Sequence, residues 1–286
     1  MTQAQNLRRL LEGGRIIAAP GAPDSLSARL VQRARFEAVY MTGFGATATR
    51  LGTPDIGLLT QTEMTEHARN MTRAASIPVI ADADTGYGGP SNIHRTVREY
   101  VQAGVAAIHL EDQVAPKRCG QMAGVKLMGR EESALRLKAA ISARAKDDLV
   151  IIGRTDALQA DGIEEALHRA RLYQDAGVDL VFVDGIKKIA DVEAVARAID
   201  GPKVVSIVDG NETTALKLAD LQDMGFSVVF YALTALLSAT RAMQDALTEL
   251  RANGAPEGGP VKHSYAEFCE IVDLGFHQQL DESFGR

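Results

Sequence analysis

The chain has 286 residues, of which 46% are apolar, 24% are charged and 5% are aromatic, with no Trp. These values are ordinary for a globular protein, and the length suits a single large α/β domain. The net charge of -6 comes without a basic block. Nucleic acid or an anionic membrane is therefore not expected as the main partner, because both require concentrated Lys and Arg.

The two cysteines and the first residues bear on the compartment. Cys119 and Cys269 are too few for a disulfide framework and fit a reducing environment. Residues 1–7 lack the charged and apolar regions of a signal peptide, and no apolar run approaches the roughly 18 residues that cross a bilayer. We therefore expect a cytoplasmic protein without membrane contact.

From the N-terminus onward, a first helix is predicted over residues 5–12, and short Val/Ile/Ala-rich runs then alternate with longer helical stretches. The alternation continues to near residue 250. The predicted strands are 15–19, 38–42, 79–82, 106–110, 150–154, 180–183, 203–207 and 228–231.

These strands are apolar throughout, which is typical of parallel strands buried on both faces. Eight strands, each followed by a helix, predict an α/β fold of the (β/α)₈ TIM-barrel type over residues 1–250. An open doubly wound sheet is the alternative.

Three stretches break the alternation. Residues 43–60 and 111–130 have no clear period, and loops of that length inside a compact domain usually bind or cover a ligand. Residues 251–260 form a Gly/Pro-rich break, after which 265–279 predicts one more helix. We expect residues 251–286 to be a linker and a helical extension that packs on a neighbouring subunit.

Acidic residues follow the third and fourth predicted strands. Asp82 and Asp84 are two positions apart, so an extended chain turns both to one face, and Glu111 follows the next strand. Turn formation or helix capping is the simpler reading of each pair alone. Together, the three carboxylates have the all-oxygen chemistry that Mg²⁺ or Mn²⁺ requires.

Arg154 ends the fifth strand and is predicted to clamp a substrate carboxylate, with an ion pair to Asp156 or Glu111 as the alternative. The Gly43-x-Gly45-x-x-Ala48 pattern resembles a dinucleotide fingerprint. However, the expected acidic residue is missing and no helix clearly begins there. Backbone N–H groups that cradle a carboxylate are the better interpretation.

The run Lys117-Arg118-Cys119-Gly120 lies in the second long loop. A thiol between two cations is expected to have a lowered pKa. The loop is long enough to close over the mouth of a barrel, which makes Cys119 a candidate catalytic residue.

The chain resembles the isocitrate lyase and phosphoenolpyruvate mutase superfamily, in particular its methylisocitrate lyase and 2,3-dimethylmalate lyase branch. The resemblance extends along nearly the whole sequence. The motifs that carry it are Thr42-Gly43-Phe44-Gly45, Leu51-Gly52-Thr53-Pro54-Asp55, Asp82-Ala83-Asp84-Thr85-Gly86-Tyr87-Gly88, His109-Leu110-Glu111-Asp112-Gln113, Lys117-Arg118-Cys119-Gly120 and Gly153-Arg154-Thr155-Asp156-Ala157.

The resemblance implies a Mg²⁺-dependent carbon–carbon lyase, with Mn²⁺ as a possible substitute, that cleaves a 2-hydroxydicarboxylate by retro-aldol chemistry. It also implies a homotetramer in which the last barrel helix is swapped between subunits. Cys119 then acts as general acid beside Lys117, Arg154 and Glu111. The implied metal residues are Asp82, Asp84, Asp55 and Glu111, and the implied substrate residues are Thr42, Gly43, Phe44, Cys119, Gly120, Arg154, Asp184 and Ser206.

Several positions depart from the family pattern. Gln121, Asp184, Ser206 and Ala232 stand where relatives have His, Glu, Asn and Pro. The two arginines that hold a third carboxylate in methylisocitrate lyase align with Leu237 and Tyr265. A third carboxylate without partner charges is costly in a desolvated pocket, so a dicarboxylate of the substituted-malate type is expected.

Two other functions compete with the lyase. An oxaloacetate hydrolase or decarboxylase uses the same scaffold, and the cysteine loop is expected in the hydrolase but not in the decarboxylase. A dicarboxylate sensor without catalysis is the third possibility. The intact acidic set, Arg154 and Cys119 argue against it.

Overall fold

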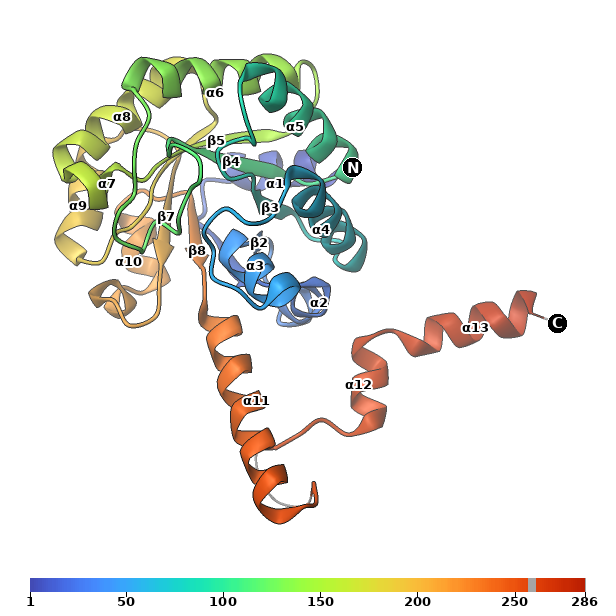
Figure 1. The fold of residues 1–286 in the computed structure, drawn as a ribbon. Coiled ribbons are helices and arrows are strands. Elements are labelled where there is room, and N and C mark those ends of the chain that lie inside the picture. Colours follow the sequence, from blue (N-terminus) through green and yellow to red (C-terminus); the bar gives the residue numbers. More distant parts are fainter. Residues whose placement is uncertain (257–260, 286) are drawn as a thin grey trace. The chain divides into compact units, whose positions relative to one another are not determined.

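A computed structural model describes residues 1–256 and 261–285. Eight parallel strands close into a barrel in which each strand pairs with the next and β8 pairs with β1 (Figure 1). The strands are β1 (Ile17–Ala22), β2 (Val39–Met41), β3 (Val79–Asp82), β4 (Ala107–Glu111), β5 (Val150–Thr155), β6 (Leu180–Val183), β7 (Lys203–Ile207) and β8 (Val228–Tyr231).

Helices surround the barrel on its outer side (Figure 1). The helices are α1 (Gln3–Glu12), α2 (Ser25–Arg33), α3 (Gly43–Leu51), α4 (Gln61–Ala74), α5 (Pro90–Ala103), α6 (Arg130–Arg144), α7 (Ala157–Asp161), α8 (Ile163–Ala176), α9 (Ile189–Ala198), a 3₁₀ turn η1 (Glu212–Ala215), α10 (Leu218–Asp223), α11 (Thr234–Asn253), α12 (Tyr265–Ile271) and α13 (Leu274–Phe284).

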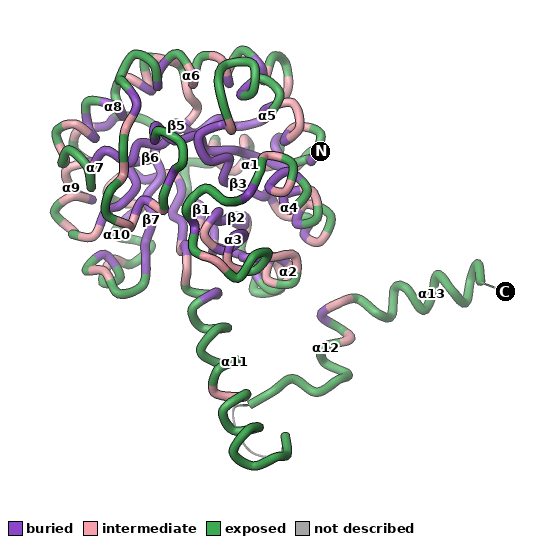
Figure 2. Tube along the Cα trace, viewed as in Figure 1, coloured by how far each residue is buried: buried purple, intermediate pink, exposed green. Residues whose placement is uncertain are grey.

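The core has two apolar layers because side chains alternate along each strand. Inward-facing residues such as Ile80, Ile152 and Val204 fill the barrel interior. Their neighbours Ala81 and Ile151 pack outward against the helices. The strands are consequently the most uniformly buried part of the chain, as Figure 2 shows.

The predicted closed barrel is confirmed, and the open sheet is excluded. All eight predicted strands are present, with ends that differ by up to three residues. Residues 43–60 were expected to lack regular structure, but α3 occupies 43–51. Its buried face consists of the small residues Gly43, Gly45, Ala46 and Thr47, which produce no visible hydrophobic period.

The segment between β4 and α6 has no helix or strand, as predicted, apart from an isolated bridge between Gln113 and Leu127. The single helix predicted over 265–279 is two helices, α12 and α13. Asp273 separates them in a left-handed conformation with φ of 63°, which an α-helix cannot continue through. Part of the predicted 251–260 break lies outside the described residues.

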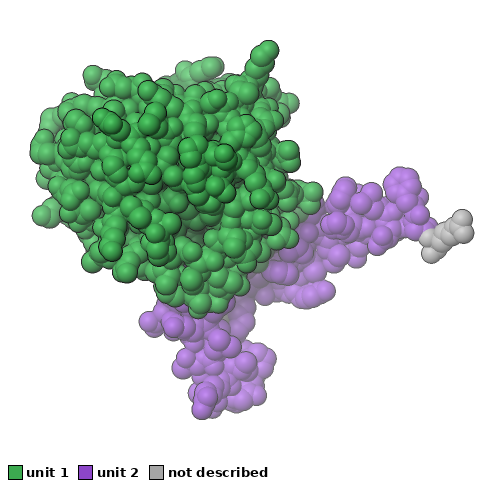
Figure 3. Space-filling view, turned by 45° about the horizontal axis from the view of Figure 1, so that its top comes forward, with its two compact units in different colours: residues 1–234 green, residues 235–286 purple. Residues whose placement is uncertain are grey.

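The chain divides into two compact units, residues 1–234 and 235–286 (Figure 3). This division falls nearer the N-terminus than the boundary predicted at residue 250. The first unit contains the whole barrel. Within residues 1–256 and 261–285, no helix combines the length and apolarity needed to cross a membrane.

Candidate active site

A cavity lies at the carboxyl ends of the strands, where sites in this barrel architecture form. Its volume is about 40 Å³, which suits roughly three water molecules. The lining residues are Tyr40, Thr42, Phe44, Asp55, Asp82, Cys119, Gln121, Arg154, Phe182, Asp184, Ser206, Val208, Ala232 and Leu233.

Every residue predicted for the site either lines this cavity or contacts a residue beside it. The five that do not line it are held close by short contacts: Gly43 to Asp82, Lys117 to Asp55, Asp84 to Lys117, and Glu111 and Gly120 to Arg154. Segments far apart in the sequence thus converge at one end of the barrel.

Lys117 lies among the acidic residues. Its Nζ is 2.8 Å from Asp55 Oδ1 and 2.6 Å from Asp84 Oδ1, and all three side chains are buried. Burial lowers the pKa of Lys117, but the surrounding carboxylates raise that pKa more, whereas burial raises the pKa of Asp84 to about 6. Lys117 therefore stays charged and offsets the local negative charge.

Asp82 ends β3 and contacts the start of α3. Its Oδ2 accepts the N–H of Gly43 at 3.2 Å, and its Oδ1 accepts the N–H of Asp84 at 2.9 Å. Asp84 lies beyond the strand with φ of 47°, so strand alternation does not govern its direction. Burial raises the pKa of Asp82, but the surrounding positive groups and the N–H of Asp84 lower it more, so Asp82 is ionised.

Arg154 pairs with four carboxylates, the most distant being Asp82 Oδ2 at 4.0 Å from Nη1. Its Nη2 is 2.7 Å from Asp184 and 2.9 Å from Asp156, and its Nη1 is 3.3 Å from Glu111. The ion-pair alternative for Arg154 is thus realised, and its guanidinium also lines the cavity. A positive group held in this way is oriented before any substrate arrives.

Cys119 differs from the expectation. The pKa of its thiol is raised to about 12, chiefly because the thiol is buried, and Asp184 and Asp55 add to the shift. The predicted lowering was wrong because the flanking cations turn elsewhere: Lys117 pairs with Asp55 and Asp84, and Arg118 is exposed. The thiol is neutral at pH 7 and carries a proton.

Within the part of the chain that the structure describes, no group of three or more His, Cys, Asp or Glu side chains is arranged to hold a metal ion. Lys117 occupies the space between Asp55 and Asp84 instead. Both carboxylate oxygens of Glu111 are nevertheless buried without a hydrogen bond. Buried carboxylate oxygens in this condition fit a hard cation.

Sequence reasoning missed the aromatic floor of the cavity. Tyr40 stacks on Phe230 with ring centroids 4.0 Å apart, and its hydroxyl is 3.0 Å from His109 Nε2. Burial lowers the pKa of His109 to about 4, so its ring is neutral. Each of these aromatic residues precedes a predicted site residue by two positions, as Tyr40, His109 and Phe182 do. Residues two apart on a strand share a face, so this spacing was the signal that could have identified the aromatic floor.

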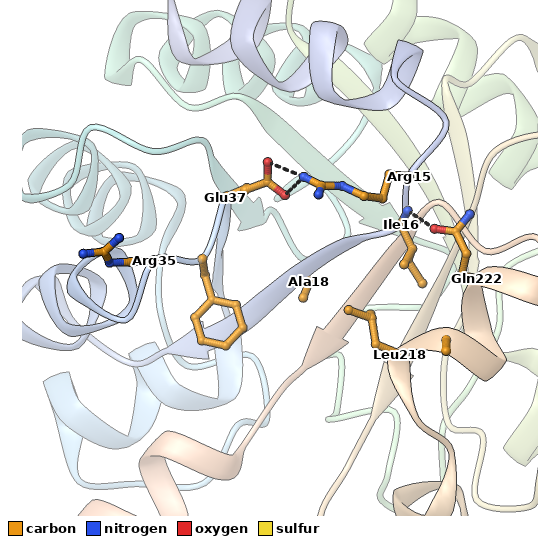
Figure 4. A pocket seen from close by; sticks show the side chains of 9 residues that line it. Arg15, Ile16, Ala18, Arg35, Glu37, Leu218 and Gln222 are labelled. Carbon is orange, nitrogen blue, oxygen red and sulfur yellow. Dashed lines mark hydrogen bonds and ion pairs between the residues drawn. The ribbon is translucent and has the colours of Figure 1, made fainter.

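A larger groove of about 530 Å³ lies at the opposite end of β1 (Figure 4). Its lining is mainly apolar; of its charged residues Arg15, Arg35 and Glu37, Arg15 and Glu37 pair with each other at 2.8 Å. Gln222 accepts a hydrogen bond from the N–H of Ile16 (Figure 4). It lacks convergent polar groups, so the chemistry belongs to the smaller cavity.

A (β/α)₈ barrel with buried carboxylates, one arginine and one thiol at the carboxyl ends of its strands defines the class of protein. The family described as phosphoenolpyruvate phosphomutase matches residues 7–251. The chain belongs to this family, the phosphoenolpyruvate mutase/isocitrate lyase superfamily.

Two curated relatives are lyases. 2,3-Dimethylmalate lyase of Eubacterium barkeri is 42% identical over 274 residues, covering 96% of this chain and 94% of that protein. 2-Methylisocitrate lyase of Bacillus subtilis is 34% identical over 284 residues, covering 99% and 93%.

Solved structures include two with bound ligands. Oxaloacetate acetylhydrolase in complex with the inhibitor 3,3-difluorooxalacetate has a TM-score of 0.94 at 34% identity and covers 99% of this chain and 97% of that one. Phosphonopyruvate hydrolase in complex with oxalate and Mg²⁺ has a TM-score of 0.90 at 30% identity and covers 100% of both chains.

Proposed function

We propose that the protein is a Mg²⁺-dependent lyase that cleaves a 2-hydroxydicarboxylate of the substituted-malate type into an oxoacid and a carboxylate. The observation that carries this proposal is the shared cavity of Cys119 and Arg154: a protonated thiol and a fixed guanidinium face the same enclosed space. The similarity to 2,3-dimethylmalate lyase supports it.

Arg154 and the start of α3 are suited to bind the oxoacid end of the substrate. The guanidinium provides a forked donor for a carboxylate, and the first N–H groups of a helix attract anions. Thr42, Gly43 and Phe44 supply that helix start beside Asp82. Ser206 and Asp184 complete the polar wall.

Glu111, whose buried oxygens accept no hydrogen bond, would hold the cation, either Mg²⁺ or Mn²⁺, together with Asp55, Asp82 and Asp84. When bound, such an ion acts as a Lewis acid that stabilises negative charge on substrate oxygens. Lys117 offsets part of the charge of Asp55 and Asp84, so the acidic cluster stays folded around the site.

The reaction breaks the C2–C3 bond of the substrate. The 2-hydroxyl loses its proton to water, its C–O bond becomes a carbonyl, and the electron pair of the C2–C3 bond moves to C3. Cys119 then donates its proton to C3 as general acid. A thiol that is neutral at pH 7 suits this step better than a thiolate does, which gives the raised pKa of Cys119 a use.

The cavity favours a substrate with two carboxylates. Arg154 is the one cationic side chain among the described residues that line it. One part of the wall is apolar and consists of Phe182, Val208, Ala232 and Leu233. A third carboxylate facing this wall has no partner charge, whereas methyl substituents pack against it.

Oxaloacetate hydrolysis is the alternative function. The similarity to oxaloacetate acetylhydrolase at a TM-score of 0.94 favours it over the decarboxylase. In that reaction water attacks oxaloacetate, and the acetate carbon leaves with the proton that Cys119 supplies. The same residues serve both reactions.

The deciding experiment is a substrate panel of malate, citramalate, 2,3-dimethylmalate, methylisocitrate, isocitrate and oxaloacetate, scored for pyruvate, glyoxylate, oxalate and CO₂. We expect pyruvate from a methylated malate. Oxalate from oxaloacetate as the dominant product favours the hydrolase, and fast cleavage of methylisocitrate contradicts the dicarboxylate preference.

We also propose that the protein assembles through a swapped helix into a homotetramer, with residues 251–286 on a neighbouring subunit. The incomplete burial of the outer face of the barrel between β1 and β8 supports this assembly. Six strands are buried at every position, but Ala18, Pro20 and Tyr231 on β1 and β8 are only partly buried. The groove in Figure 4 lies over this stretch and presents the apolar Leu218 of α10.

A further inference from the structure

Gln113 is the first residue after the Glu111-Asp112 pair, and its side chain joins two parts of the active site. Its Nε2 donates to the carbonyl of Arg118 and to Asp156 Oδ2, both at 2.7 Å. Its Oε1 accepts the N–H of Arg118 at 2.9 Å. The residue is 1% exposed, so water cannot replace these bonds.

Only a primary amide of this length satisfies all three partners at once. Two donors and one acceptor are used, and a carboxylate at the same place has no donor and would face Asp156. An apolar side chain leaves the backbone of Arg118 and one oxygen of Asp156 without these partners.

Each end of this bridge leads to a reacting group. Arg118 immediately precedes Cys119. Asp156 uses its other oxygen, Oδ1, to accept from Arg154 Nε at 3.0 Å and from Nη2 at 2.9 Å. One side chain therefore spans the loop that carries the thiol and the carboxylate that orients the guanidinium.

The backbone beside this bridge has a separate anchor. Asp112, not Gln113, fixes the backbone of β5 here: its Oδ1 accepts the N–H of Asp156 at 3.0 Å, and its Oδ2 accepts the hydroxyl of Thr155 at 2.7 Å. Gln113 additionally orients the Asp156 carboxylate and holds the loop in position.

We propose that Gln113 is a positioning residue that couples closure of the 113–129 loop to the orientation of Arg154, so that Cys119 and the guanidinium are in place together. This proposal rests on the proposed lyase function for the roles of Cys119 and Arg154. Cys119 and Gln121 of this loop line the cavity, so closure of the loop completes the cavity wall. Gln113 then re-forms its three bonds at each closure.

The test compares Gln113→Met, which keeps the length and removes the amide, with the matched control Gln3→Met. Gln3 also donates to two groups, the carbonyls of Thr72 and Ala75, and accepts one N–H, that of Val79, at the far end of the barrel. If Gln113→Met does not fold, Gln113→Asn replaces it, because one methylene less prevents the amide from reaching both partners.

Two quantities are measured in each variant. The first is the rate of alkylation of Cys119 by iodoacetamide without substrate, read by mass spectrometry so that Cys269 is counted separately. The second is kcat and KM for the substrate found in the panel. We expect alkylation to be about tenfold faster, because the bonds that seat the loop are lost. We expect kcat to fall by about 100-fold, with a smaller change in KM.

The control variant is expected to match the wild type in both quantities. If Cys119 is alkylated at the same rate in Gln113→Met and Gln3→Met, the proposed link between Gln113 and the loop is overturned, whatever the value of kcat. An unchanged kcat overturns the link to Arg154. If the wild type cleaves no member of the panel, the proposed function fails, while the alkylation comparison still decides whether Gln113 seats the loop.

Discussion

The thiol of Cys119 keeps its proton because of its surroundings, not its sequence neighbours. Burial and the carboxylates of Asp184 and Asp55 raise its pKa to about 12, and the adjacent Lys117 is committed to Asp55 and Asp84. A group that remains protonated over the whole physiological range is suited to deliver a proton to a carbanion.

Replacing Cys119 with Ser is expected to reduce kcat by about 100- to 10,000-fold, the usual contribution of a general acid. Binding of oxalate in the presence of Mg²⁺, measured by calorimetry, should change little, since the hydroxyl has nearly the same size. Cys269→Ser is the control and should retain activity. Retained turnover in Cys119→Ser contradicts the assignment of this acid.

Gly120 is the point of closest approach between the loop and the ion pairs. A Cβ there would lie 2.5 Å from Asp184 Oδ2 and 2.6 Å from Asp156 Oδ1. Gly120→Ala should therefore keep the loop from closing and lower kcat by at least about tenfold. Gly129→Ala, at the end of the same loop with nothing within 4 Å, is the control that should leave kcat unchanged.

At the scale of elements, α6 and α8 are joined by a charge network that also supports the loop. Glu165 of α8 accepts from Arg130 of α6 and from Arg169, and Arg169 donates to the carbonyl of Met128 at 3.0 Å. These hydrogen bonds lower the pKa of Glu165 from 4.5 to about 2.

Because the folded-state pKa of Glu165 is depressed, its contribution is complete above the unfolded value of 4.5 and is lost as the pH falls toward 2. Glu165→Gln should lower the free energy of unfolding by about 1–2 kcal/mol at pH 7, discounted because Arg130 is half exposed. Urea unfolding at pH 7 and pH 3 measures this, and the difference from wild type should shrink at pH 3.

Glu193→Gln is the matched control, because Glu193 pairs with Arg197 one turn along an exposed helix face. Such a pair contributes a few tenths of a kcal/mol at most. A destabilisation by Glu165→Gln that is equal at both pH values would show that its loss of charge is not the cause.

At the scale of the whole molecule, the proposed metal dependence rests on the buried oxygens of Glu111. Removing divalent ions with EDTA should abolish turnover, and Mg²⁺ should restore it. The melting temperature should rise on adding Mg²⁺ to the stripped protein, because an ion that binds only the folded state stabilises it. Full activity in the metal-free protein contradicts the proposed mechanism.

The proposed assembly uses the groove beside β1. Leu218→Glu places a charge in this groove, where Leu218 is 39% exposed. If a partner helix covers it, this charge is desolvated and the particle mass should fall, as measured by light scattering after gel filtration. Leu135→Glu on α6, where Leu135 is 64% exposed, tests whether any exposed leucine has this effect.

The sequence alone determined the barrel and placed most of the candidate site at one end of it. Continuous apolar runs such as 150–154 identify parallel strands because burial on both faces leaves no polar alternation. Polar residues at strand ends, such as Asp82 and Arg154, identify the site because all carboxyl ends of a parallel barrel meet on one side. Neither inference requires knowledge of which segments touch.

Only the tertiary structure decided the electrostatics and the couplings. The raised pKa of Cys119, the pairing of Lys117 with Asp55 and Asp84, and the bridge from Gln113 to Asp156 all join segments distant in sequence. Burial and Coulomb interactions depend on distances through space, which sequence spacing does not report. For that reason the flanking cations misled the expectation for Cys119.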